Sequence, residues 1–129
     1  MILDSSAVVA ILMREPGHEA LQVRIAGAPR VAIGAPTLLE VGIVLAARWG
    51  QDVRGLLSRF LLEADVATIP FTDAHFGSAL GAWLRFGRGR HPAQLNFGDC
   101  LAYATAVIAG EPLLFVGDDF AQTDIPVAR

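Results

Sequence analysis

Five carboxylates stand at positions where parallel α/β proteins place their chemistry. Asp4 follows a short apolar run, and Asp118 and Asp119 follow another. Glu40 and Asp99 lie inside strongly apolar segments, where a charge is costly unless it has a partner. Ligand sites in open parallel sheets lie beyond the carboxyl ends of the strands. We therefore expect these acids to face a shared pocket.

A pocket of this kind suits a hard divalent cation. Carboxylates that lie close together raise one another's pKa unless a cation neutralises them. The chain has no lysine to do so, and its histidines, His18, His75 and His91, are scattered. Ligands that are all oxygen favour Mg²⁺, with Mn²⁺ as a substitute, over zinc. Such an ion activates water and stabilises charge on a phosphodiester oxygen, so the acids predict a metal-dependent hydrolase.

Each acid also has a purely structural interpretation. The sequence TLLE at residues 37–40 matches a capping box, in which the acid bonds back to the start of its helix. The sequence NFGD at residues 96–99 likewise puts an acid in a first helical turn, where the helix dipole favours it. Asp4 could cap the first helix, as could Ser5 or Ser6. Four such positions in one small chain favour a shared pocket over independent caps.

Composition excludes several protein classes. All 10 basic residues are Arg, which excludes P-loop nucleotide-binding and Schiff-base enzymes because both need a lysine. The single cysteine, Cys100, excludes a disulfide framework and a zinc site with several thiolates. The net charge of −3 does not recruit nucleic acid by bulk attraction. No signal peptide or clean membrane-spanning run is visible, so we expect a soluble cytoplasmic protein without membrane association.

The pattern of apolar runs predicts the elements that position the acids. A length of 129 residues fits one domain, 1–129, and 53% hydrophobic residues with a mean hydropathy of +0.49 suggest a surplus of apolar surface, such as a dimer face. Alternating short and amphipathic segments indicate an α/β fold with a central, mostly parallel sheet and helices on both faces. The predicted strands are 1–3, 31–34, 66–69 and 113–116, and the predicted helices are 5–14, 18–26, 37–49, 53–64, 73–86 and 97–109.

An ordered set of short motifs resembles the PIN-domain ribonucleases, and within them the VapC toxins of toxin–antitoxin pairs. The motifs are ILDSSA at residues 2–7, TLLE at 37–40, LNFGD at 95–99 and LLFVGDDF at 113–120. The resemblance covers essentially the whole chain. It implies a PIN-like fold and a Mg²⁺-dependent endoribonuclease that cuts tRNA or ribosomal RNA with metal-activated water.

The same resemblance assigns roles to individual residues. Asp4, Glu40 and Asp99 match the family's metal-binding acids, with Glu40 either a ligand or a base that orients water. Ser6 and Asn96 match positions that support the site. These roles follow from the resemblance and not from spacing alone.

The fourth acid of the family has no direct match. Many relatives carry it where this chain has Gly117, so Asp118 or Asp119 would have to replace it. We expect Asp119 to be the more structural of the two and Asp118 the more mobile candidate. The displaced acid motivates an alternative, a catalytically degenerate PIN-like module that binds RNA or protein. A metal-dependent phosphatase or DNA nuclease on the same scaffold is a third possibility.

A basic stretch precedes the third acid. Arg85, Arg88 and Arg90 lie in a segment without acids, and arginines that contact phosphates can position RNA without reading its sequence. The alternative is a solvated helix end whose arginines complement the helix dipole. The resemblance implies a VapB-like antitoxin that blocks the site and itself binds operator DNA, so no direct DNA binding is expected. The apolar surplus fits a homodimer or a groove for an amphipathic antitoxin helix.

Overall fold

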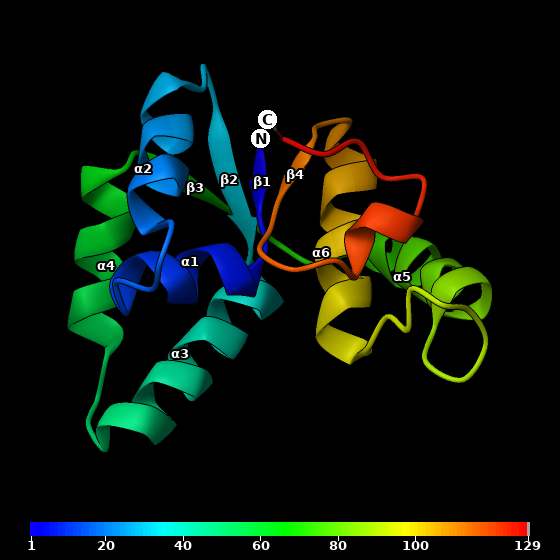
Figure 1. The fold of residues 1–129 in the computed structure, drawn as a ribbon, viewed down its shortest axis with the longest axis horizontal. Helices are drawn as coiled ribbons and strands as arrows, with labels where there is room; N and C mark the ends of the chain where they lie inside the picture. The colour runs from blue at the N-terminus through cyan, green and yellow to red at the C-terminus, as the bar shows by residue number, and fades with distance from the viewer. Residues whose placement is uncertain (129) are drawn as a thin grey trace.

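A parallel sheet forms the centre of the molecule (Figure 1). The structure is a computed structural model, and it describes residues 1–128. Four strands lie in the order β3-β2-β1-β4, and every strand pairing within residues 1–128 is parallel. The strands are β1 (Ile2–Leu3), β2 (Val31–Gly34), β3 (Val66–Ile69) and β4 (Leu113–Leu114).

Helices cover both faces of this sheet, as predicted. Figure 1 shows α1 to α4 on one side and α5 and α6 on the other. Side chains alternate between the faces along each strand, so Leu3 and Ile33 pack in the core beneath α1 to α4 while Ile2 packs beneath α5 and α6. The helices are α1 (Ser5–Leu12), α2 (His18–Gly27), α3 (Ala35–Trp49), α4 (Arg54–Glu63), α5 (Asp73–Phe86) and α6 (Phe97–Ala109), followed by the 3₁₀ turn η1 (Phe120–Gln122).

The start of α3 corrects a prediction. The helix begins at Ala35 rather than after Thr37, because Pro36 fits in a first turn, where its missing N–H is not needed. Thr37 is buried, and its hydroxyl has no hydrogen-bond partner within residues 1–128. The alternative interpretation of Thr37 and Glu40 as a capping box is therefore wrong, and Glu40 is left without that structural role.

Two other boundaries settle the region around the first helix and the last strand. Of the three residues considered as the cap of α1, Asp4 is the one that caps it. The strand β4 ends at Leu114, two residues early, and the N–H of Val116 donates to the hydroxyl of Ser6 instead of extending the sheet. This hydrogen bond draws the loop after β4 toward the end of β1.

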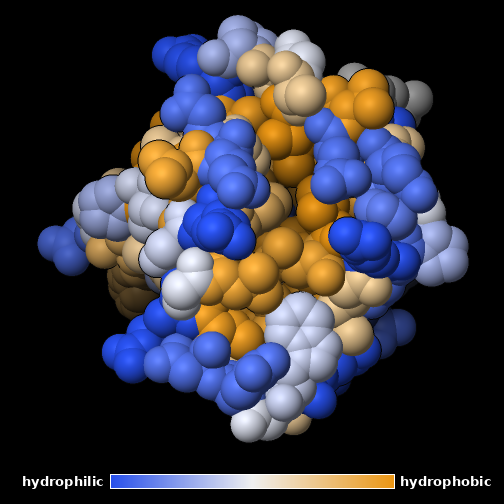
Figure 2. Space-filling view, turned by 90° about the vertical axis from the view of Figure 1, so that its left-hand side faces the viewer, coloured by the Kyte–Doolittle hydropathy of each residue, from blue (hydrophilic) through white to orange (hydrophobic). Residues whose placement is uncertain are grey.

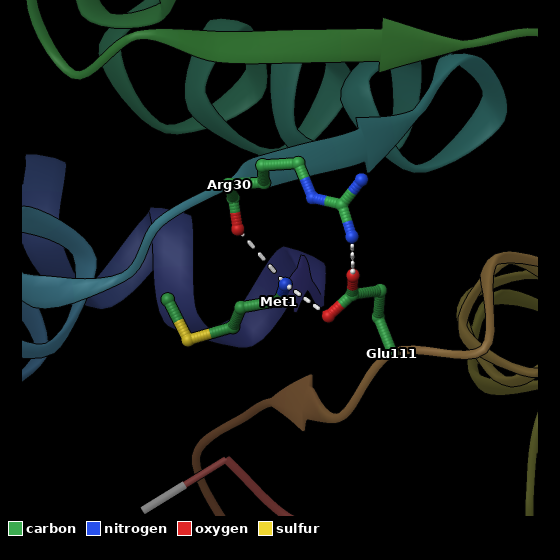
Figure 3. A network of polar contacts seen from close by, with 3 residues as sticks. All are labelled: Met1, Arg30 and Glu111. Carbon is green, nitrogen blue, oxygen red and sulfur yellow. Dashed lines mark hydrogen bonds and ion pairs between the residues drawn. The ribbon is translucent and has the colours of Figure 1, made fainter.

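A polar network fixes the opposite end of β1 (Figure 3). The amino group of Met1 donates to the carbonyl of Arg30 at 2.9 Å and to the carboxylate of Glu111 at 3.1 Å. The guanidinium of Arg30 donates to the same carboxylate at 3.0 Å. The network ties β1 to the segments that lead into β2 and β4, and so sets the alignment of all three strands. No helix within residues 1–128 is long and apolar enough to cross a membrane.

Candidate active site

Asp4 lies directly beyond the carboxyl end of β1 and is only 3% exposed. Its Oδ2 accepts a hydrogen bond from the N–H of Ser6 at 3.1 Å and another from the hydroxyl of Ser6 at 2.5 Å. Its Oδ1 is buried and has no partner. One oxygen therefore caps α1, and the other is available to a ligand.

Asp99 has a similar double character at the start of α6. Its N–H donates to the side chain of Asn96 at 2.8 Å, and its Oδ2 accepts from the N–H of Asn96 at 3.0 Å. This reciprocal pair is a capping box, where the sequence pattern indicated only an acid in the first helical turn. As with Asp4, only one carboxylate oxygen takes part in the cap.

Glu40 reaches the site from the first turns of α3. Its Oε1 is buried and has no hydrogen-bond partner. The carboxylate lies against Gly98, beside the start of α6: a Cβ added at Gly98 would fall 2.8 Å from the Cδ atom of Glu40. The fold thus places the Glu40 carboxylate next to the residue that precedes Asp99.

The acids act on one another electrostatically. Burial, opposed by the hydrogen bond from Asn96, raises the pKa of Asp99 to about 6, and the charges of Asp4, Asp119 and Glu40 add to the rise. Burial is also the main cause that raises the pKa of Asp4, with a further contribution from Glu40. Segments that are far apart in the sequence therefore contribute to one acidic pocket.

Two acids, Asp118 and Asp119, lie in the loop after β4. The charge of Asp119 is among the causes that raise the pKa of Asp99. Asp119 precedes η1 but makes no side-chain cap there within residues 1–128. Asp119 is therefore a candidate for the fourth acid, and Asp118 stays the alternative.

The carboxylate oxygens have the donor chemistry that a cation needs, but they are not grouped around one point. Within residues 1–128, no three side chains of His, Cys, Asp or Glu are grouped closely enough to hold a metal ion. The unpartnered oxygens of Asp4 and Glu40 are nonetheless hard donors of the kind that Mg²⁺ prefers. Like charges repel, so carboxylates draw fully together only around a cation.

The other reactive side chains serve packing. Nδ1 of His75 bonds to Thr72 at the start of α5, and Nδ1 of His91 accepts from the N–H of Ala93. Burial, with the charge of Asp99, raises the pKa of Cys100 to about 11. A thiol with so high a pKa stays protonated near neutrality and is a poor nucleophile.

The three arginines expected to contact RNA differ from one another. Arg85 forms an ion pair with Asp124 at 2.9 Å, a neutralisation that the local sequence did not reveal. Arg90 stacks 4.6 Å from the centre of the Trp83 ring. Arg88 is exposed and makes no ion pair within residues 1–128.

Gly98 is a feature of the site that the sequence interpretation missed. It was read only as part of the motif around Asp99. Glycine weakens a helix. Its presence inside a predicted helix was therefore the sequence signal that could have identified Gly98 as a residue of the site.

Comparisons with known proteins show the family to which the chain belongs. The sequence model of the PIN domain family matches residues 1–126. Ribonuclease VapC36 of Mycobacterium tuberculosis is 46% identical over 126 residues, covering 97% of this chain and 91% of the relative. Ribonuclease VapC of Mycolicibacterium smegmatis is 40% identical over 125 residues, covering 97% of both chains.

Solved structures show the same fold at lower identity. The chain is similar to the crystal structure of Mycobacterium tuberculosis VapC20, a toxin that cleaves the sarcin-ricin loop, with a TM-score of 0.72, 20% identity, and coverage of 99% of this chain and 98% of that one. A toxin–antitoxin complex from Klebsiella pneumoniae has a TM-score of 0.69 at 20% identity, with coverage of 95% and 92%. The chain therefore belongs to the PIN domain family, among its VapC ribonucleases.

Proposed function

We propose that this protein is the toxin of a toxin–antitoxin pair and a Mg²⁺-dependent endoribonuclease, with Mn²⁺ as a substitute ion. The observation that carries the proposal is the acidic pocket, in which Asp4 and Glu40 each keep a buried oxygen without a protein partner. Its position beyond the carboxyl end of β1 is where parallel sheets bind ligands. The VapC ribonuclease relatives support RNA as the substrate.

The donor chemistry fits a magnesium ion. Asp4, Glu40 and Asp99 would hold it through oxygen atoms, and Asp119 would add a fourth negative charge. Once bound, the ion would lower the pKa of a water molecule and stabilise negative charge on the scissile phosphate. The acids would hold in place the positive charge that a lysine supplies in other phosphoryl-transfer sites, since this chain has no lysine.

Neighbouring side chains hold the acids in place before a ligand binds. Ser6 and Asn96 each hold one oxygen of a neighbouring aspartate, which leaves the second oxygen directed away from the helix cap. Fixed carboxylates need less reorganisation when a ligand arrives. Glu40, whose Oε1 has no other partner, is suited to orient the attacking water or to accept its proton.

Arg88 is the arginine best suited to an RNA phosphate, because Asp124 neutralises Arg85 and the Trp83 ring covers Arg90. A single phosphate contact positions RNA but does not select its sequence. We extend the proposal to tRNA or ribosomal RNA as the target class on the strength of the family.

An antitoxin segment would bind the groove between α1, α2 and α4. This groove has a volume of about 700 Å³, and Figure 2 shows apolar side chains gathered between hydrophilic flanks on this side of the molecule. An amphipathic helix can lay its apolar face in such a groove while its charges meet the flanks. The charged residues of the lining are Arg14, Arg30, Arg59, Glu63 and Asp65.

A second copy of the chain would cover a different groove, between α3, α5 and the start of α6. Its volume is about 760 Å³, and Glu40 is the one charged residue of its lining. Apolar surface of this kind is typical of homodimer interfaces. The exposed members include Leu39, Ile43, Phe76 and Phe97, which are 60 to 79% exposed. We further propose that residues 1–129 form one domain, act in the cytoplasm and do not bind DNA directly.

The decisive experiment combines purified protein, an RNA pool and Mg²⁺, with EDTA as a control. We expect cleavage that leaves a 5′-phosphate and a 3′-hydroxyl, and we expect EDTA, Asp4→Asn or Asp99→Asn to abolish it. Binding of RNA without cleavage would favour the degenerate module, and cleavage of single-stranded DNA or a phosphomonoester instead of RNA would favour the third possibility. Cleavage by the two variants at the parental rate would show that the site is wrongly assigned.

A further inference from the structure

We propose that Gly98 is a positioning residue of the candidate site, because the Glu40 carboxylate occupies the space that any side chain at this position would fill. The absence of a Cβ at Gly98 thereby fixes where this carboxylate lies relative to Asp99. The inference rests on the proposed function, since Gly98 has this role only if Glu40 serves the metal site.

The steric evidence is specific to one group. A Cβ at Gly98 would lie 2.8 Å from both Cδ and Oε1 of Glu40, and closer still to Oε2. Distances below 3.0 Å are essentially never seen for real Cβ atoms. The three nearest atoms all belong to this one carboxylate, so the space beside Gly98 is filled by Glu40.

The backbone gives no other reason for glycine here. Gly98 is not among the residues with positive φ, so any L-residue can adopt its conformation. It is the second residue of α6, where alanine would form the helix more readily. The carboxylate, and not the helix, is therefore the feature that requires a glycine.

A larger residue would displace the carboxylate without blocking the fold. The clashing atoms lie at the far end of a flexible side chain, which can rotate away at little cost. Substitution of Gly98 should thus weaken metal binding without lowering the stability of the fold.

The test compares Gly98→Ala with Gly55→Ala. Gly55 is likewise the second residue of its helix, α4, but nothing lies within 4 Å of a Cβ added there. We expect both variants to unfold in EDTA at a temperature equal to or above that of the parent. Gly98→Ala should bind Mn²⁺ about 10-fold more weakly or worse by calorimetry and cleave RNA correspondingly slowly, whereas Gly55→Ala should match the parent in both.

A double-mutant cycle shows whether the effect passes through Glu40. Glu40→Ala should itself weaken Mn²⁺ binding, and adding Gly98→Ala to it should cause no further loss. A full additional loss in the Glu40→Ala background would mean that Gly98 acts through α6 and Asp99, which would overturn the inference.

The outcomes for the parent protein separate the two proposals. A parent that binds Mn²⁺ and cleaves RNA, with a Gly98→Ala variant that does both equally well, overturns the role of Gly98 alone. A parent that neither binds Mn²⁺ nor cleaves RNA overturns the proposed function, and the role of Gly98 with it.

Discussion

Asp99 shows how one side chain can cap a helix and still serve a pocket. Its Oδ2 accepts from the N–H of Asn96, while burial and the neighbouring acids raise its pKa to about 6. A carboxylate used only as a cap has a stabilised charge and a lowered pKa. The raised pKa therefore indicates that the ionised Asp99 carboxylate lowers the stability of the fold, as functional residues often do.

This cost should appear in the pH dependence of stability. The folded-state pKa of Asp99, about 6, lies above the ordinary value of 3.8, so the folded protein keeps a proton that the unfolded chain has lost. Stability should therefore fall as the pH rises through the window from about 4 to 6. Urea unfolding in EDTA across this range measures the fall.

Asp99→Asn should make that fall less steep, because the amide does not titrate, while the raised pKa of Asp4 still contributes to it. Asp118→Asn removes a charge but leaves Asp99 itself unchanged, and it should keep most of the parental slope. A slope that is equally steep in Asp99→Asn would contradict this explanation.

The two acids that follow β4 should differ in function. The charge of Asp119 is among the causes that raise the pKa of Asp99, so we expect Asp119→Asn to weaken Mg²⁺ binding by about 10-fold or more. Asp118→Asn is the matched comparison, and we expect it to have the smaller effect. Calorimetric titration of both variants with Mg²⁺ gives the ranking, and a larger loss in Asp118→Asn would assign the role of fourth acid to Asp118.

At the scale of elements, the start of α6 supports the site through its cap. Asn96→Ala removes the acceptor for the N–H of Asp99 and should cost about 1 kcal/mol of folding free energy. Asn96→Ser keeps a side-chain oxygen and should recover most of that loss. Chemical denaturation of the three proteins measures both effects, and an unchanged midpoint in Asn96→Ala would show that the cap contributes nothing to stability.

Local sequence patterns predicted the helices and strands better than they predicted which residues contact one another. The place of Asp99 in a first helical turn was predicted correctly, because Asn96 and Asp99 lie in one turn. The similar pattern at Thr37 failed because the preceding Ala35 and Pro36 are also helical and Thr37 turns into the core. A four-residue pattern does not contain the information that decides where a helix begins.

Long-range partners were the main gap in the sequence interpretation. The Asp124 carboxylate that neutralises Arg85 lies 39 positions away, so the basic stretch looked more available than it is. The contact between Glu40 and Gly98 depends in the same way on how α3 meets α6. The motifs indicated which acids belong to the pocket, but only the fold shows what surrounds them.

At the scale of the whole molecule, the groove between α3 and α5 predicts the oligomeric state. The parent should be a dimer in solution, and Phe76→Asp should make it monomeric, because Phe76 lines the groove and is 62% exposed. Val23→Asp changes a side chain that is 71% exposed on α2, outside this groove, and should leave the dimer intact. Light scattering after gel filtration reports both masses. A monomeric parent at micromolar concentration would contradict the dimer.

The central place of β1 also has a consequence for protein synthesis. Its neighbours β2 and β4 come from residues 31–34 and 113–114, so a growing polypeptide cannot complete the sheet until the second of these emerges from the ribosome. Asp99 and Asp119 also lie late in the sequence, so they emerge only after most of the chain has been made. The candidate site can therefore form only late in translation, after most of the chain has been synthesised.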